Sequence, residues 1–143
     1  GPFMRPEFYR RAVFPIYRQL WRELHARGKK LLYCSDGRYD MFMDDIVACG
    51  ADGLIFEPSN PYAEVVERFG GRVCLIGSAV DCRSLAFEPW SRIQAQIDQT
   101  LAVSRGVAGI MLAVGNHIPA NVPDETCERY MDYLRRNWGR GPD

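Results

Sequence analysis

Short apolar runs recur along the chain, and each ends on polar side chains. The runs lie at 29–35, 52–57, 72–78 and 107–114. They are rich in Leu, Ile and Val and do not alternate with polar residues, a pattern typical of strands covered on both faces of a parallel sheet. We therefore predict four parallel strands at these ranges.

Amphipathic segments separate these runs and predict helices. Apolar residues at helical spacing indicate helices over 6–27, 40–49, 60–70, 90–104 and 124–137. The segment 79–89, which contains Asp81, Cys82 and Pro89, is predicted to be a longer connection between the third strand and the next helix.

Three residues predict local features of these helices. Pro15 removes an internal hydrogen bond, so we expect a kink or a break in the first helix. Asn60 is expected to cap the third helix, with Pro61 as its first residue.

The order of these elements is one helix followed by four strand–helix units, and the crossover helices force the strands to be parallel. Four such units make either a small open sheet or half of an eight-stranded barrel. The opening helix and the lack of a Gly-rich phosphate fingerprint after the first strand favour the half barrel. We treat 1–143 as a single domain with a frayed tail at 139–143.

Composition narrows the function classes. The 143 residues are 47% hydrophobic and carry 18 basic and 18 acidic side chains, so the formal charge is zero. A binder of nucleic acid or of anionic membranes needs a basic surplus, which is absent from this sequence. The sequence shows no signal peptide or apolar run of membrane-spanning length, and its five cysteines show no CxxC spacing. We therefore expect a reduced, cytoplasmic protein.

Chemically capable side chains stand at the carboxyl ends of the predicted strands. In chain order they are Cys34, Ser35 and Asp36, then Glu57, then Asp81 and Cys82, then Asn116 and His117. In parallel α/β folds, successive loops bring such residues together. The sequence therefore predicts a shared, enzyme-like pocket.

Glu57 and His117 are the strongest candidates for function. Glu57 follows directly on an apolar strand, so its carboxylate needs a polar cavity or a partner. His117 lies between an apolar strand and a proline-containing loop, and could act as a ligand, an acid–base group or a substrate donor. With Cys34 they have the ligand types of a zinc site, although no compact HxxxH or CxxC spacing marks one.

Structural roles stay open for the other candidates. Cys34 can be a small residue at a strand end, and Asp36 can cap a turn. Asp81 can bind backbone amides instead of substrate. Cys82 lies beside Arg83, which would lower the pKa of its thiol.

Several short motifs follow one another in a specific order and spacing. The last strand and its loop read Gly115-Asn116-His117-Ile118-Pro119-Ala120-Asn121-Val122-Pro123, followed by a predicted helix. Earlier segments are Cys34-Ser35-Asp36-Gly37, Gly50-Ala51-Asp52-Gly53-Leu54 with Glu57-Pro58, and Gly77 through Asp81 with Leu85. Together these motifs resemble the uroporphyrinogen decarboxylase superfamily. The resemblance covers nearly the whole chain, and it depends on the order and spacing of the motifs.

The resemblance implies a (β/α)8 barrel, of which these residues would form the last four strands and the helix before them. It also implies one of two chemistries. One is the cofactor-free decarboxylation of the acetate arms of a porphyrinogen. The other is methyl transfer to or from a corrinoid protein, usually with a zinc that activates a thiol or polarises a methoxyl substrate. In the decarboxylases, the other half of the barrel carries an arginine-rich substrate loop and an essential aspartate.

The motifs that distinguish the two chemistries match neither subgroup strictly. The decarboxylases of this superfamily carry a Gly-His-Gly pattern at the last strand, whereas this chain has a glycine followed by Asn116 and His117. The zinc-thiol methyltransferases carry a His-x-Cys pattern at the first of these strands, whereas this chain has Cys34-Ser35-Asp36. They carry a Cys at the last strand, whereas this chain has Asn116. The chain looks closest to members linked to corrinoid-dependent demethylation, so we expect a methyltransferase or demethylase, with decarboxylation as the alternative.

The resemblance also gives each candidate residue an expected role. The catalytic candidates are Glu57, His117 and Asp81, and the candidate zinc ligands are Cys34, Glu57 and His117. The candidates for substrate binding are Asn116, Asp36 and Arg38. Decarboxylation would need cationic groups for the substrate carboxylates, for which Arg38 and Arg83 are the local candidates.

The expected partners are a small-molecule substrate and a corrinoid protein, with no nucleic acid and no membrane. Four strands also leave two sheet edges unpaired and one face uncovered. We therefore expect the chain to pair with itself or with a missing amino-terminal half. A half barrel that is catalytically inactive by itself is the third possibility.

Overall fold

The computed structural model describes residues 2–114 and 116–138. Four parallel strands form one sheet in the order β1-β2-β3-β4, which confirms the prediction. The strands are β1 (Leu32–Cys34), β2 (Gly53–Ile55), β3 (Cys74–Gly77) and β4 (Ile110–Leu112). Each is shorter than its apolar run, because the runs bend into loops on either side of the paired segment. The predicted tail at 139–143 and Gly115 lie outside the described residues.

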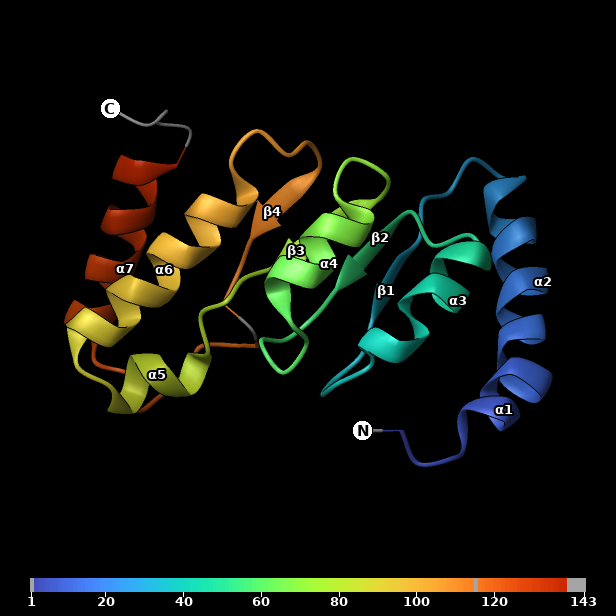
Figure 1. Cartoon of the computed structure of the whole chain (residues 1–143), viewed down its shortest axis with the longest axis horizontal. Helices are drawn as coiled ribbons and strands as arrows, with labels where there is room; N and C mark the ends of the chain where they lie inside the picture. Colours follow the sequence, from blue (N-terminus) through green and yellow to red (C-terminus); the bar gives the residue numbers. More distant parts are fainter. Residues whose placement is uncertain (1, 115, 139–143) are drawn as a thin grey trace.

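Helices alternate with the strands as expected. They are α1 (Pro6–Phe8), η1 (Tyr9–Val13), α2 (Phe14–His25), η2 (Asp40–Phe42), α3 (Met43–Ala48), α4 (Tyr62–Phe69), α5 (Cys82–Phe87), α6 (Trp90–Ser104) and α7 (Asp124–Asn137). The helices lie in one layer in front of the sheet, with α2 and α7 at opposite ends of the molecule (Figure 1). Within the described residues, no helix is long and apolar enough to cross a membrane.

The predicted irregularity near Pro15 is a π-helical turn. The segment η1 spans Tyr9–Val13, and the N–H of Phe14 bonds to the carbonyl of Tyr9, five residues earlier. In a regular α-helix, the Pro15 ring would collide with the carbonyl of Arg11. The wider π turn moves that carbonyl away, so the helix passes the proline without ending.

One element was missed and one local prediction was wrong. The longer connection over 79–89 contains α5, whose first turn is capped by the Asp81 side chain accepting from the Arg83 N–H at 2.8 Å. Asn60 is not the cap of α4, since Pro61 occupies the N-cap position and no side chain caps that helix. The Asn60 side chain instead bonds across to another loop, as described below.

The two faces of the sheet differ in burial. The register aligns Cys34, Ile55, Ile76 and Met111 across the four strands, so these side chains share one face. That face is open in the described chain: the side chain of Met111 is 58% exposed. The opposite face carries the fully buried Leu54 and packs against the helices. A sheet covered by helices on one side only is the arrangement expected of a partial α/β barrel.

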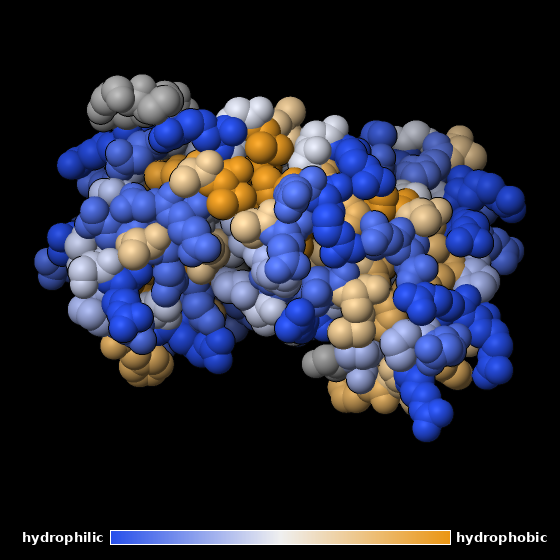
Figure 2. All heavy atoms as spheres, viewed as in Figure 1, coloured by the Kyte–Doolittle hydropathy of each residue, from blue (hydrophilic) through white to orange (hydrophobic). Residues whose placement is uncertain are grey.

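Two apolar cores hold the helix layer to the sheet. One lies under α2, α3 and α4 and includes Ile46, Phe56 and Phe69. The other lies under α5, α6 and α7 and includes Ile97 and Tyr130. The outer surface of this layer is mostly hydrophilic, with a limited apolar area near its centre (Figure 2). The helix layer is therefore solvated, and the open sheet face is the unusual surface of the chain.

Candidate functional site

The carboxyl ends of the strands surround a hollow of ≈ 250 Å³, called the strand-end hollow below. It is lined by Cys34, Ser35, Asp36, Ile55, Phe56, Glu57, Ile76, Ala113, Val114 and Asn116. Its walls are the apolar inner face of the sheet, and its rim is formed by the loops after β1, β2 and β4. The structure thus brings the polar residues that follow three of the four strands to one place.

Glu57 is the centre of the hydrogen-bond network in the hollow. One carboxylate oxygen, Oε2, accepts from the backbone N–H of Gly37 at 2.8 Å. The other, Oε1, accepts from the side-chain amide of Asn116 at 2.5 Å. Gly37 has φ 72°, a left-handed conformation that suits glycine and presents its N–H to the carboxylate. The half-buried carboxylate expected to need a partner therefore has two.

Asn116 joins Glu57 to His117. Its side-chain oxygen Oδ1 lies 2.7 Å from the backbone nitrogen of His117, which donates to it. The same oxygen lies 2.8 Å from the ring nitrogen Nδ1 of His117. Glu57 and His117 therefore belong to one hydrogen-bonded chain, although His117 itself is exposed and does not line the hollow.

Asn60 holds the loops of the site in position, a role that the sequence did not reveal. Its side chain is fully buried and accepts from the backbone N–H of Tyr39 at 2.8 Å. Its amide donates to the carbonyl of Gly37 at 3.0 Å and to that of Glu57 at 3.1 Å. One side chain thus ties the loop after β1 to the loop after β2. The only sequence signal was a polar residue next to Pro61, which reads equally well as a helix cap.

Tyr39 strengthens the same connection. Its hydroxyl donates to the carbonyl of Ile55 at 2.8 Å, and its ring packs edge-on against Tyr33. Burial raises the pKa of the Tyr39 hydroxyl, so this group is a neutral donor at physiological pH. The Tyr39 hydroxyl therefore holds the loop after β1 against β2 at neutral pH.

Cys34 and Asp36 line the hollow as expected. Both are exposed, and Cys34 is a free thiol. Arg38 lies one residue beyond Gly37 and is also exposed, but it pairs with Asp40 at 2.8 Å and does not line the hollow. The hydrogen bond from Arg38 lowers the pKa of the Asp40 carboxyl, so this pair persists at neutral pH.

Asp81 serves the local structure and lies outside the lining of the hollow. It caps α5 and forms an ion pair with Arg83 at 2.5 Å. The hydrogen bond from Arg83 lowers the pKa of the Asp81 carboxyl. The expected lowering for Cys82 is wrong: burial, together with the charge of Asp81, raises the pKa of that thiol.

The three candidate zinc ligands do not form a metal site in this arrangement. Among residues 2–114 and 116–138, no three His, Cys, Asp or Glu side chains lie close enough together to hold a metal ion. Both oxygens of the Glu57 carboxylate are engaged by Gly37 and Asn116, and Nδ1 of His117 is engaged by Asn116. The described residues therefore do not fit a zinc ion by themselves, and zinc stays a prediction.

Comparison with known families identifies the family to which the chain belongs. The model of the family "Uroporphyrinogen decarboxylase (URO-D)" matches residues 1–137. The chain belongs to this family, whose members fold as (β/α)8 barrels, and the four-stranded sheet is part of such a barrel. No curated protein matches the chain. The family resemblance and the half-barrel architecture predicted from the sequence are thus confirmed.

Proposed function

We propose that the chain contributes to the active site of a methyl-transferring member of the family, with a corrinoid protein as methyl acceptor. The charge of the strand-end hollow supports this proposal. Its charged lining residues are Asp36 and Glu57, and within the described chain no lysine or arginine lines it. The nearest arginines that the sequence offered, Arg38 and Arg83, pair with Asp40 and Asp81.

An acidic hollow is a poor match for a substrate with several carboxylates. Two carboxylates in a site of reduced polarity repel each other, and neither finds a cationic partner here. A methoxylated or otherwise methylated donor without negative charge avoids this cost. The acidic, cation-free lining described here therefore supports methyl transfer. A decarboxylase would have to supply its cations from the other half of the barrel, which carries the arginine-rich loop in those enzymes.

The proposed reaction needs a proton donor. When a methyl group passes to a nucleophilic acceptor, the electrons of the broken bond stay on the oxygen or sulfur of the donor. That leaving group then requires a proton. His117 would supply the proton as a general acid, and Glu57 would hold the loops that carry it. The corrinoid would supply the nucleophile that takes the methyl group.

The test is a direct comparison of two activities. The chain is incubated with methoxylated aromatic compounds and with methylated thiols, using a reduced corrinoid as acceptor, and the metal content is measured in parallel. A separate titration follows the binding of uroporphyrinogen. Methylated corrinoid and weak porphyrinogen binding are the expected results. Tight porphyrinogen binding without methyl transfer would replace this proposal with decarboxylation.

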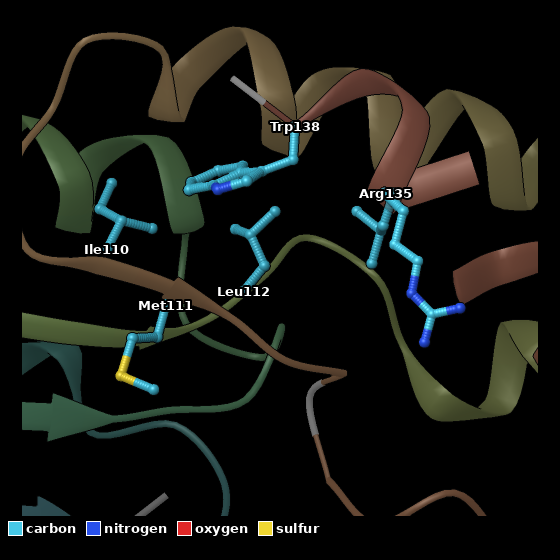
Figure 3. Close-up of a pocket in the computed structure, with 6 residues that line it drawn as sticks. Ile110, Met111, Leu112, Arg135 and Trp138 are labelled. Atoms are coloured by element: carbon cyan, nitrogen blue, oxygen red, sulfur yellow. The ribbon is translucent and has the colours of Figure 1, made fainter. Parts of the chain in front are cut away.

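We also propose that further barrel strands cover the open face of the sheet, supplied by a second copy of the chain or by an amino-terminal half. Within the described residues, no strand pairs with the outer edges of β1 and β4. Beside β4, an apolar groove of ≈ 390 Å³ lies between the strand and α7, with Trp138 and Leu112 on its walls (Figure 3). Exposed strand edges next to apolar surface favour pairing with another strand.

Light scattering tests this association. A dimer, or a complex with the other barrel half, is expected. A monodisperse monomer that stays stable over a wide concentration range would contradict it.

A further inference from the structure

We propose that Asn116 is a positioning residue that locks the His117 ring in the tautomer protonated at Nδ1, with Nε2 left as the acceptor nitrogen of the neutral ring. The inference follows from the donors and acceptors along the chain Glu57–Asn116–His117. It deepens the proposed function, on which the catalytic meaning of the tautomer rests.

The orientation of the Asn116 amide is set by Glu57. A carboxylate only accepts hydrogen bonds, so the group of Asn116 that faces Glu57 must be its NH2. This contact measures 2.5 Å from Nδ2 to Oε1. The second carboxylate oxygen is occupied by the N–H of Gly37 at 2.8 Å, which holds Glu57 in place. The Asn116 oxygen is thereby turned towards His117.

The Asn116 oxygen in turn selects the His117 tautomer. Oδ1 is an acceptor only, so a ring nitrogen 2.8 Å away must carry a hydrogen. The backbone N–H of His117 donates to the same oxygen at 2.7 Å, which opposes a flip of the amide. A flipped amide would turn its NH2 towards the backbone N–H of His117, so that two donors would face each other. The flip would also turn its oxygen towards the Glu57 carboxylate, which would lose its donor. Nδ1–H is therefore the tautomer that satisfies every group in the chain.

The consequence for chemistry concerns the other ring nitrogen. With the Nδ1 hydrogen bonded to Asn116, the lone pair of the neutral ring lies on Nε2. In the proposed reaction, the protonated ring would keep Nδ1–H on Asn116 and donate from Nε2 to the leaving group. Glu57 then acts through Asn116, by fixing which nitrogen is available.

The second histidine of the chain provides an internal reference. The sequence contains two histidines, and His25 contacts the Asp52 carboxylate through Nε2 at 2.8 Å. A carboxylate accepts only, so His25 should carry its hydrogen on Nε2. The two histidines are thus expected to hold opposite tautomers in the same protein.

The experiment is a long-range 1H–15N NMR correlation of the imidazole rings, recorded in mildly alkaline buffer and assigned with His25→Gln. The expected spectrum shows His117 protonated at Nδ1 and His25 protonated at Nε2. In Asn116→Ala and in Glu57→Gln, the excess of the Nδ1–H form at His117 should be lost while His25 stays unchanged. Asp36→Asn, which removes a charge from the same hollow, should leave both rings as they are.

Other outcomes overturn the proposal. Protonation of His117 at Nε2 in the unmodified chain would do so, as would an Nδ1–H form that survives Asn116→Ala. Backbone amide spectra verify that each variant is folded. The NMR measurement needs no substrate, so its result stands whether or not methyl transfer is observed. Failure of the proposed function would appear only in the methyl-transfer assay.

Discussion

The carboxylate of Glu57 accepts a 2.5 Å hydrogen bond from the amide of Asn116, 59 residues further along the chain. The two residues follow β2 and β4, so the bond passes over the end of β3. A glycine at the end of β3 allows the chain after β2 to pass close by, since a Cβ at Gly77 would lie 2.8 Å from the carbonyl oxygen of Phe56. The loops of non-adjacent strands are therefore joined directly above the hollow.

The buried side chain of Asn60 should be essential for the loops that carry the site. Asn60→Ala removes four hydrogen bonds and leaves the Tyr39 N–H, two carbonyls and the Ser59 hydroxyl without this partner. We expect a loss of about 2–4 kcal/mol in the free energy of unfolding, measured by urea denaturation. Gln99→Ala, on the exposed face of α6, is the matched control and should change stability by less than about 0.5 kcal/mol. Equal stabilities of the two variants would refute this role of Asn60.

Asp52 should make stability depend on pH in acid. Burial alone would raise its pKa, but hydrogen bonds from Lys30, His25 and the N–H of Leu31 outweigh burial and lower the pKa to about 2. A carboxyl with a depressed pKa stabilises the fold above its unfolded pKa of about 4 and loses this effect as the pH falls towards 2. The effect is at most about 2 kcal/mol, because the Lys30 side chain is solvated.

The corresponding variant is Asp52→Asn. It should be less stable than the unmodified chain at pH 7 and should show a smaller loss between about pH 4 and pH 2. Urea titrations across this range measure both effects, with Asp132→Asn at an exposed position as control. The same pH slope in Asp52→Asn and in the unmodified chain would contradict the assignment.

A charge placed on the open face of the sheet should weaken association only if that face is covered in solution. Met111→Lys introduces a charge at a position that is 58% exposed in the single chain and would be interior in a closed barrel. We expect the variant to lower the association constant by about 10-fold or more while leaving the fold of the chain intact, as seen by sedimentation and circular dichroism. Glu67→Lys on the outer surface of α4 should not affect association. If both variants associate like the unmodified chain, the open face is not the interface.

The thiols should differ in reactivity. Cys34 is the exposed one, whereas the pKa of Cys82 is raised by burial and by the charge of Asp81. Because the thiolate is the nucleophile, a maleimide at neutral pH should modify Cys34 first. Peptide mass spectrometry identifies the site, and a bound methylated donor should slow the modification of Cys34. Faster labelling of Cys82 would contradict this assignment.

The strands and the position of the hollow could be predicted because both depend on local patterns. Each apolar run that ends on a polar group marks the carboxyl end of a strand, and parallel strands bring these ends together. That reasoning placed Cys34, Asp36, Glu57 and Asn116 in one region, where the structure has them. It also expected Asp81 to bind backbone amides as an alternative to a catalytic role.

The remaining features depend on long-range geometry that local patterns do not contain. Asn60 bonds to Tyr39, 21 residues away, and nothing near Asn60 in the sequence specifies that partner. The short α5 was missed because its 6 residues are too few to show a clear apolar periodicity. The hydrogen-bonded link from Glu57 to His117 through Asn116 depends on how the loops after β2 and β4 lie relative to each other, which local sequence patterns do not specify.

The central claim is that the strand-end hollow around Glu57 is the site of methyl transfer. The most direct measurement compares kcat/KM for methyl transfer in Glu57→Gln and in Glu64→Gln, an exposed carboxylate on α4. The protein is used in the associated form that light scattering identifies. We predict a decrease of about 10²-fold or more for Glu57→Gln, because the NH2 group that replaces one carboxylate oxygen cannot accept the hydrogen bond from Gly37 or from Asn116. No change is expected for Glu64→Gln. Equal rates in the two variants would show that the chemistry takes place elsewhere.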